Sequence, residues 1–542
     1  MTEAAAACKR LESLKAARQP HEETWRQCFL YVDPIRSDGF NSTGKTSDEV
    51  RSDRANVTDS TADDSARMLA AAIMSGLTPA NSRWFGLDVG DETDEERRWL
   101  DRGAEIVWKN IHNANYDAEA YEASLDLVGG GWFVLFIDDD REHGGYVFTQ
   151  FPIGTCYLAS SRPDGRADTL YRTYQLTADA CASTFGLDNL SEQTRKLAQE
   201  KPDTMVDLLH VVEPRKLHVP GARLAKNMPF ASYTFEVNAK KLLRESGYHE
   251  CPFIAPRWKR ISPSSAYGIG PIANALADIK TLNLLVRNEL IATDLAVAGM
   301  WIAEDDGVLN ARTIKVGPRK VIVANSVESM KPLLTGSDFQ VSFTVKADLQ
   351  RAIRKVMMSD QLEPKDGPAM TATEVHVRVN LIRQLLGPVY GRLQPEWLRP
   401  LVERCFGLAF RAGILGPMPE SLRDREYMVS YDSPMARAQK LEDVSAMDRF
   451  EASLGIQMQQ IGQVDPEAAI ELMDNYNADA AQRKKAELLG VPAELIVDAK
   501  DVAKRRAARA EQKQQQQQQA MLAQGMSKAA EAAGTRIAQR AL

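Results

Sequence analysis

Residues 271–290 read PIANALADIKTLNLLVRNEL, and this stretch decides the fold. Its apolar side chains recur every three or four positions, a spacing that places them on one face of a helix. The stripe consists of Ile272, Leu276, Ile279, Leu282, Val286 and Leu290. We expect a single helix from Pro271 to Ala298, roughly 40 Å long at ~1.5 Å per residue.

A small β-rich insertion is predicted directly after this helix. The segment Trp301–Leu334 contains Gly307, the pair Gly317-Pro318 and the strand-like run Lys320–Ala324. Glycine and proline mark turns, and a short β-branched run between turns is typical of a strand. Val321, Ile322 and Val323 are expected to form the core of this insertion, and direct contact with a partner is the alternative.

Helical periodicity returns from Thr344 to Gln361 and then breaks. The break comprises Glu363, Pro364, Lys365, Asp366, Gly367 and Pro368. Prolines and glycine interrupt a helix, so we expect a mobile loop between two helical segments. Helix is predicted to resume at Thr371, to pause at Gly387-Pro388 and to continue to about Ala412.

Residues 1–260 have a mixed α and β pattern. Helices are expected at 11–32, 61–75, 94–114 and 178–185, strands at 132–137, 146–151, 169–175, 205–213 and 232–237, and a polar loop at 37–60. Residues 433–499 are predicted to be helical, and the glutamine-rich tail that follows is expected to be disordered or a continuing helix. The fold class is therefore α+β, mainly α.

Charge and cysteine content exclude several functional classes. The 542 residues carry a formal net charge of −7, whereas a protein that grips DNA tightly normally has a basic excess. The cysteines are scattered without a C-x-x-C pair, so no zinc site or disulfide framework is predicted. Neither a signal peptide nor a membrane-spanning segment is expected.

One alternative is a P-loop ATPase that uses Gly39–Thr46 and Asp138. Residues 39–46 read GFNSTGKT, which matches the phosphate-binding pattern, and Asp138 follows an apolar strand. However, Pro34 and charged residues precede the motif where a buried strand is required. The strand before Asp138 also turns straight back at Gly144-Gly145, which predicts a hairpin and not a central parallel strand. We therefore disfavour this alternative.

Other catalytic and metal-binding patterns are absent from the sequence. The seven histidines are dispersed, and the run Asp138-Asp139-Asp140 at a hairpin tip is more typical of solvated charge than of a metal site. We expect no enzyme activity, no cofactor and no metal.

Four segments together resemble the portal, or head-to-tail connector, family of short-tailed bacteriophages. They are Asp59–Phe85 with its Gly-Leu-Thr-Pro turn, Gly129–Asp138, Tyr267–Asn283, and Thr371–Glu396 with its Leu386-Gly387-Pro388-Val389 turn. The second segment has Gly-Gly-Gly where the family more often has Gly-Thr-Gly. Each motif is weak alone, and their order along the chain makes the resemblance specific.

The resemblance implies the domain plan of a portal. That plan is a wing at 1–266, a first stem helix at 267–299, a clip at 300–340, a second stem helix at 341–361, a tunnel loop at 362–370, wing and crown helices at 371–432, a crown at 433–500 and a low-complexity tail at 501–542.

The resemblance also implies a function and partners. About twelve copies would form a ring at one capsid vertex of the virion, assembled in the host cytoplasm, through which double-stranded DNA is packaged and ejected. The expected partners are the terminase packaging motor, then tail adaptor proteins, with capsid and scaffolding proteins around the ring. Basic residues on the second stem helix and tunnel loop are candidates to face DNA, although solvation or pairing with neighbouring subunits is the alternative; these are Lys346, Arg351, Arg354, Lys355 and Lys365.

Overall fold

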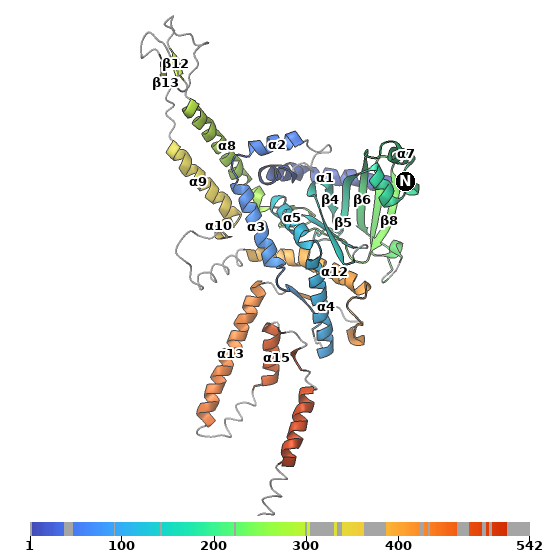
Figure 1. Cartoon of the computed structure of the whole chain (residues 1–542), viewed down its shortest axis with the longest axis vertical. Helices are drawn as coiled ribbons and strands as arrows, with labels where there is room; N and C mark the ends of the chain where they lie inside the picture. The colour runs from blue at the N-terminus through green and yellow to red at the C-terminus, as the bar shows by residue number, and fades with distance from the viewer. Residues whose placement is uncertain are drawn as a thin grey trace, which may run out of the picture. The chain divides into compact units, whose positions relative to one another are not determined.

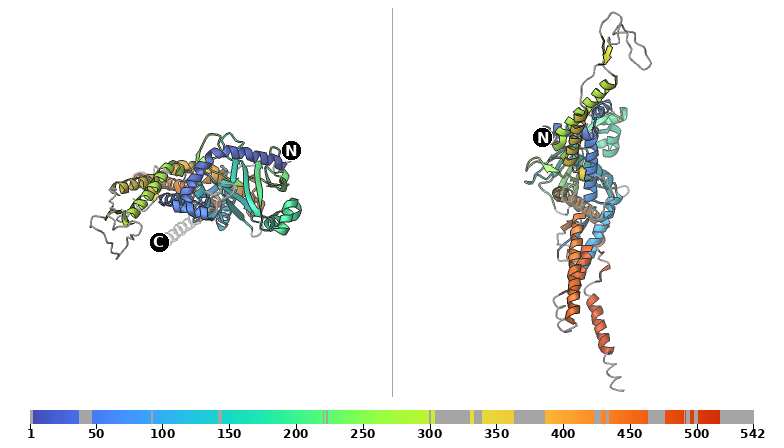
Figure 2. Two further views of the ribbon diagram at one scale, coloured as in Figure 1. Left: turned by 90° about the horizontal axis from the view of Figure 1, so that it is seen from above. Right: turned by 90° about the vertical axis from the view of Figure 1, so that its left-hand side faces the viewer.

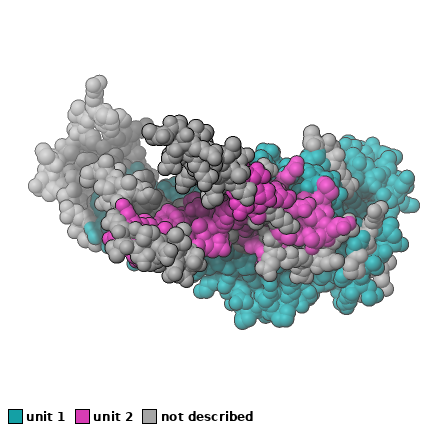
Figure 3. Space-filling view, turned by 90° about the horizontal axis from the view of Figure 1, so that it is seen from below, with its two compact units in different colours: residues 1–85, 105–416, 433–435 teal, residues 86–104, 417–432, 436–542 magenta. Residues whose placement is uncertain are grey.

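The protein divides into two compact units, which are coloured separately in Figure 3. Unit 1 comprises residues 1–85, 105–416 and 433–435, and unit 2 comprises residues 86–104, 417–432 and 436–542. The computed structural model describes residues 3–36, 47–90, 93–140, 144–219, 221, 224–298, 301–303, 330–332, 339–362, 386–422, 428–431, 434–462, 476–489, 491, 495–497 and 501–516. The two units are taken in turn.

A five-stranded antiparallel sheet forms one half of unit 1. Its strand order is β4-β5-β6-β7-β8, with bounds Cys156–Ala159, Thr169–Thr177, Met205–Pro214, Phe230–Glu236 and Lys241–Tyr248. Helix α1 (Glu3–Val32) covers one face and contacts both edge strands, an arrangement visible in Figures 1 and 2. The guanidinium of Arg18 fixes this helix, because Nη1 donates to the carbonyls of Ile153 and Cys156 at 3.1 and 2.7 Å.

The opposite face of this sheet packs on a second, three-stranded sheet. Strands β3 (Tyr146–Phe151), β2 (Val134–Asp139) and β9 (Phe253–Ile254) lie in that order, all antiparallel. Alternating apolar side chains from both sheets form the core between them. The predicted hairpin is therefore confirmed, and Asp138 lies at its end in an antiparallel sheet.

Two long antiparallel helices follow the sheets in unit 1. Helix α8 (Pro271–Ala298) has the predicted bounds, and α9 (Phe339–Val356) packs beside it and leads to α10 (Ser359–Leu362). Of the predicted stripe, Ile272, Ile279, Leu282 and Val286 are buried, and Leu276 is half-buried. Its last member, Leu290, is 58% exposed, so the expectation that it packs inward is wrong.

The strand pair β12 (Trp301–Ala303) and β13 (Met330–Pro332) lies between these helices in sequence and is antiparallel. This pair agrees with a β-rich insertion, although Val321, Ile322 and Val323 lie outside the described residues.

Further elements complete unit 1. The helices are α2 (Ser47–Asn56), α3 (Thr61–Leu77), α5 (Tyr116–Gly129), α6 (Ala178–Phe185), α7 (Glu192–Glu200), residues 386–393, the π-helix η6 (Gln394–Leu398) and α12 (Arg399–Arg411); 3-10 turns are η2 (Ile153–Thr155), η3 (Leu187–Asn189) and η4 (Ala225–Asn227), and short strands are β10 (Lys259–Arg260) and β11 (Gly268–Ile269). Helix α4 (Asp94–Asn113) has residues in both units.

Two of these elements correct the sequence expectations. Residues 47–56 form helix α2 and not a loop; acidic residues in its first turn and Arg54 in its last turn complement the helix dipole. Gly387 and Pro388 lie within helical residues 386–393, so the predicted pause is not seen there.

The described part of unit 2 is mostly helical and contains one strand pair. Its elements are β1 (Phe85–Asp88) with β14 (Met428–Tyr431), η7 (Glu420–Leu422), α13 (Pro434–Gly462), α15 (Ala478–Leu489) and the helical residues 501–516. Lys485 joins α15 to α13, since its Nζ lies 2.6 Å from both Asp448 Oδ1 and Glu451 Oε2. Residues 501–516 are helical, which agrees with the alternative of a continuing helix for that part of the tail.

Candidate functional site: the long helix pair and its supports

The pair α8–α9 carries four of the five candidate basic residues, and the structure separates them by environment. Lys346 turns toward α8, where its Nζ lies 3.5 Å from Glu289 Oε2. Ser342 of α9 also donates a hydrogen bond to Glu289, at 2.5 Å. The charge of Lys346 is therefore compensated within the same chain.

Arg351 and Lys355 lie on a different face of α9. Both are exposed and are four residues apart, so they lie on one side of the helix, away from buried Ile353. Arg351 Nη1 lies 3.0 Å from Asp348 Oδ1 on the same exposed face. Arg354 is half-buried. Lys365 and the rest of the predicted loop, 363–368, lie outside the described residues.

A polar cluster holds the helix pair to the segment before α3. Asn283 of α8 is 7% exposed, and its Oδ1 accepts from the backbone N–H groups of Thr58 and Asp59 at 2.8 and 3.2 Å. Its Nδ2 donates to Ile279 O at 2.9 Å. From the other helix, Gln350 Nε2 donates to Asp59 Oδ2 at 2.9 Å. A buried amide is satisfied here on both its donor and acceptor sides, which fixes the position of α8 relative to α9.

The backbone of Gly131 packs against the backbone of Ile269 and Gly270, just before α8 begins. Gly131 has φ +87°, and a Cβ at this position would lie 2.1 Å from the carbonyl carbon of Ile269 and 2.2 Å from Gly270 N. Gly131 O also accepts from Trp258 N at 2.8 Å, and Trp25 Nε1 donates to Gly268 O at 3.3 Å. Only glycine combines this close approach with a left-handed backbone, so Gly131 is a packing residue.

Helix α3 is held in the same way by residues 386–393. A Cβ at Gly76 would lie 2.1 Å from the hydroxyl oxygen of Tyr390. Tyr390 Oη also donates to Ala72 O at 3.4 Å. The Gly-Leu-Thr-Pro segment and the Leu-Gly-Pro-Val segment therefore meet in space at a tyrosine.

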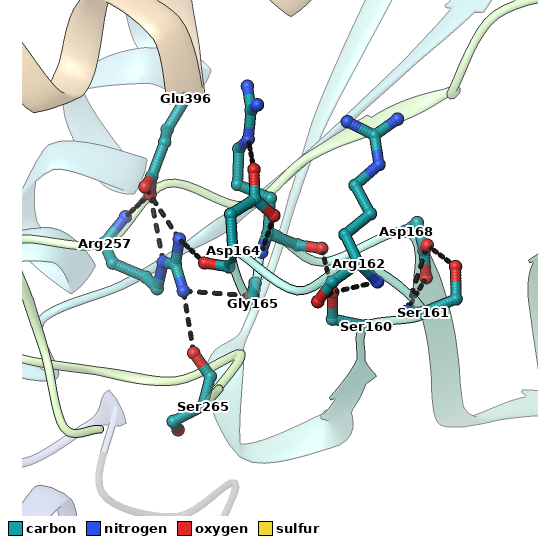
Figure 4. A network of polar contacts seen from close by, with 10 residues as sticks. Ser160, Ser161, Arg162, Asp164, Gly165, Asp168, Arg257, Ser265 and Glu396 are labelled. Carbon is teal, nitrogen blue, oxygen red and sulfur yellow. Dashed lines mark hydrogen bonds and ion pairs between the residues drawn. The ribbon is translucent and has the colours of Figure 1, made fainter. Parts of the chain in front are cut away.

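A buried ion pair joins η6 to the segment before α8 (Figure 4). Arg257 Nη2 lies 2.7 Å from Glu396 Oε1, Nε lies 3.1 Å from Oε2, and the backbone N–H of Arg257 donates to Oε2 at 3.1 Å. The second terminal nitrogen, Nη1, donates to Gly165 O at 2.9 Å and Ser265 O at 2.7 Å. Both side chains are nearly buried, so each polar atom that gives up its hydrogen bonds to water needs a hydrogen-bond partner within the protein.

The contacts described around the helix pair are hydrogen bonds, one buried ion pair and close backbone packing. Asp138 lies 4.0 Å from Arg404 Nη2, and burial raises the pKa of its carboxyl to about 6. The motif Gly39–Thr46 lies outside the described residues. Among the described residues there is no group of three or more His, Cys, Asp or Glu side chains placed to hold a metal ion.

Several supporting residues could not have been found from the sequence. One residue of each contact lies within the quoted motifs, namely Asp59, Asn283 and Glu396. Their respective partners lie outside the motifs, namely Gln350, Thr58 and Arg257. No spacing rule connects Arg257 to Glu396, which is 139 positions away. The glycines were the usable signal, since glycine where a strand or helix begins often marks a close backbone approach.

No helix in the described part of the chain is long and apolar enough to cross a membrane.

Most of the chain matches one known protein family. The family described as bacteriophage head to tail connecting protein matches residues 4–497. The portal protein of Salmonella phage epsilon15 is 28% identical over 535 residues, which cover 93% of this chain and 90% of the relative. The probable portal protein of Bordetella phage BPP-1 is 28% identical over 485 residues, which cover 86% and 84%.

Among solved structures, a chain from the neck of an empty GTA particle covers 70% of this chain and 85% of its own length. Its sequence identity is 13% and its TM-score is 0.35, which is too low to bear on the fold.

Proposed function

The chain belongs to the family of bacteriophage head-to-tail connecting proteins and has a portal role at the capsid vertex, and from this premise we propose that its copies close into a ring around a DNA channel. The ring serves as the passage for genome packaging and ejection. Identical subunits in a ring need one surface that fits another surface of the next copy. We propose about twelve subunits, as the resemblance implies.

The observation that carries this proposal is the rigidly supported helix pair. Helices α8 and α9 pack side by side. Polar, glycine and ion-pair contacts hold them to other segments of unit 1. Helices are suited to line an aqueous passage, because their backbone polar groups are satisfied internally. We propose that α8 and α9 are the stem, with β12 and β13 in the clip and residues 362–370 as the tunnel loop.

Arg351 and Lys355 are the residues of this stem proposed to face DNA. Both are exposed on the side of α9 that does not pack on α8. Lys346 fits this role less well, because its pair with Glu289 is largely shielded from solvent, whereas the pair of Arg351 with Asp348 is exposed and therefore weak. A few basic side chains on a chain with net charge −7 would guide the backbone without holding it, since each neutralised phosphate adds affinity.

Exposed apolar side chains on α8 supply a surface for the next subunit. Leu284 is 60% exposed and Ile291 is 52% exposed. They are seven residues apart and so lie on the same face. Large apolar side chains repeated on one face of a long helix are typical of a helix-packing seam, and a second copy of this chain would cover them in the ring.

The proposed partner proteins follow from the assignment of α8 and α9 to the stem and of β12 and β13 to the clip. The clip is proposed to dock the terminase motor during packaging and tail adaptor proteins afterwards, and capsid and scaffolding proteins would surround the wing. Assembly would take place in the host cytoplasm. We propose no catalytic step, and the P-loop alternative has no support from the family.

Native mass spectrometry of the purified full chain, with negative-stain images of the same sample, tests the proposal. Closed rings of about a dozen subunits with a central hole are expected. A monomer or small oligomer at every concentration would refute ring formation by the isolated chain. For the channel residues, Arg351→Gln with Lys355→Gln should alter DNA packaging while rings persist, whereas Lys346→Gln should act on stem stability instead.

A further inference from the structure

A basic helix ends the described part of unit 2. Residues 501–516 are helical, and all of them are exposed except Val502, which is half-buried. Their sequence, DVAKRRAARAEQKQQQ, has five lysines and arginines against two acids, a formal charge of +3. Because the whole chain carries −7, the remainder of the chain carries −10. Positive charge is therefore concentrated on a segment that a ligand can reach from solvent.

Three of these cations lie along one side of the helix. Arg505, Arg509 and Lys513 follow one another at intervals of four residues, which is the spacing of neighbours on a helix surface. None of the three has an ion pair among the residues that the structure describes. Glu511 is two positions from both Arg509 and Lys513 and so does not face them. Like charges at this spacing destabilise an isolated helix, and an anion beside the row would balance them.

The helix is attached to the rest of unit 2 near its start. Arg506 forms a two-point ion pair with Asp479 of α15, with Nη1 2.5 Å from Oδ2 and Nη2 2.7 Å from Oδ1. One turn earlier, Lys504 Nζ lies 3.5 Å from Asp501 Oδ1. After Arg506 the helix contains only alanine, glutamine and charged residues. The row of three cations is therefore fixed at one end and accessible along its length.

We propose that Arg505, Arg509 and Lys513 form a binding site for the phosphate backbone of double-stranded DNA. The row is about 12 Å long at ~1.5 Å per residue, which corresponds to about three to four phosphates of one strand at ~3.4 Å each. Phosphates along this side of the helix remove the repulsion between neighbouring cations, so DNA binding and helix formation favour each other. The choice of DNA rests on the proposed function, but the site is in unit 2 and does not include the residues of α9 proposed to face the channel.

The composition of the helix favours DNA over an acidic protein as the partner. A protein that docks on a helix gains most of its affinity from large, mostly apolar side chains at the centre of the contact. Between Arg505 and Lys513 the helix offers only alanine and glutamine besides its charges. The DNA backbone needs no apolar anchor, because the release of counterions supplies the affinity whatever the base sequence. With three cations per chain the contact stays salt-dependent and weak, as the passage of DNA requires.

Fluorescence anisotropy of a labelled DNA duplex, titrated with the purified full chain at several salt concentrations, tests the site. The test variant carries three substitutions: Arg505→Gln, Arg509→Gln and Lys513→Gln. It should bind the duplex at least about tenfold more weakly at low salt, because three phosphate contacts are lost. The slope of log affinity against log salt concentration should also become shallower by about 2–3.

A matched control separates the site from the overall charge of the chain. It removes three exposed cations of unit 1 by the substitutions Lys201→Gln, Lys259→Gln and Arg260→Gln. The control has the same net charge as the test variant and should keep the affinity and the salt slope of the wild type. Native mass spectrometry of the same samples separates this inference from the proposed ring. If no protein in the set forms rings but the test variant alone loses DNA binding, the ring is refuted and the DNA site stands.

Three results would overturn the assignment. One is no binding of the duplex by the wild type at low salt, and another is equal binding by the wild type and the test variant or an equal loss in the test and control variants. The third is tighter binding of a hexaglutamate peptide than of the duplex, lost in the test variant, which would assign the row to an acidic protein. Circular dichroism and thermal melting establish that each variant is folded. Should the triple variant not fold, Arg509→Gln alone should still reduce the salt slope by about one.

Discussion

The Arg257 guanidinium and the Glu396 carboxylate form a two-point ion pair, with Nη2 2.7 Å from Oε1 and Nε 3.1 Å from Oε2. The arginine side chain is 1% exposed and that of the glutamate 10%. Arg257 also donates to the backbone carbonyls of Asp164, Gly165 and Ser265, so it ties the segments around residues 164, 257 and 265 to η6. A contact of this kind specifies position, because neither charge has another ion-pair partner among the residues that the structure describes.

Removing one partner of this pair should be costly. We expect Glu396→Ala to lower the free energy of unfolding by about 3–5 kcal/mol, because a buried arginine is left without its counter-ion. Urea unfolding followed by circular dichroism measures the change. Glu403 provides the matched control, since it pairs with Arg399 at 2.8 Å on an exposed helix surface. Glu403→Ala should cost no more than about 1 kcal/mol; equal losses for the two variants would contradict the role assigned to Glu396.

The glycine contact at the start of α8 predicts a second difference between matched variants. Gly131→Ala places a methyl group against Ile269 and Gly270 and also strains a backbone with φ +87°. Gly144→Ala meets the same kind of strain at φ +76° with no atom within 4 Å. We expect Gly144→Ala to cost about 1–3 kcal/mol and Gly131→Ala about 1–3 kcal/mol more, from overpacking. Thermal melting of both variants gives the comparison, and similar melting temperatures would mean that the backbone approach is not tight.

Much of this fold could be predicted from local sequence patterns, because the spacing of apolar residues reflects the period of the helix or strand that they form. The stripe from Ile272 to Val286, the β2–β3 hairpin and strands β5 to β7 each repeat with the period of their own secondary structure. Periodicity identifies the apolar face of a helix but not where its packing partners end, which is why Leu290 is exposed. Helix α2 has little apolar character, and its charge pattern alone gave too weak a signal.

The supports of the helix pair could be predicted only in part. The four motif segments were recognised, yet their contacts with one another join residues far apart in the chain. Thr58 and Asn283 are 225 positions apart, and no spacing brings them together. Lys346 was taken as a candidate to face DNA, whereas its neighbour Glu289 on α8 was not considered as a partner. Such pairs become visible only when tertiary packing is known.

His210 should make stability depend on pH in a definite direction. Burial, then the charges of Arg172 and Arg244, lower its pKa from an ordinary value of 6.5 to about 4. Because the unfolded chain then takes up the proton first, stability falls as pH drops from about 6.5 to about 4 and is fully present above that window. Between pH 7 and pH 5 the loss from this residue is at most about 2 kcal/mol.

Urea unfolding of the wild type and His210→Gln at both pH values isolates this contribution. The difference in unfolding free energy between pH 7 and pH 5 should be smaller in His210→Gln. His218 is exposed, so His218→Gln should retain the pH dependence of the wild type. An identical pH dependence in all three proteins would mean that His210 is not the buried neutral group described above.

Ring assembly should be sensitive to the exposed apolar face of α8. Leu284 and Ile291 contribute little to the stability of a single chain, because both side chains are more than half exposed. If the next subunit covers them in the ring, Leu284→Asp buries an unpaired charge at every interface, and each such burial costs several kcal/mol. We therefore expect native mass spectrometry to detect rings for the wild type and only monomers or small oligomers for Leu284→Asp, with unchanged thermal unfolding of the monomer. Leu217 is 90% exposed on the β6–β7 connection, and Leu217→Asp is the control that should still form rings. Rings formed equally by Leu284→Asp would place the subunit contact on another surface of the helix pair.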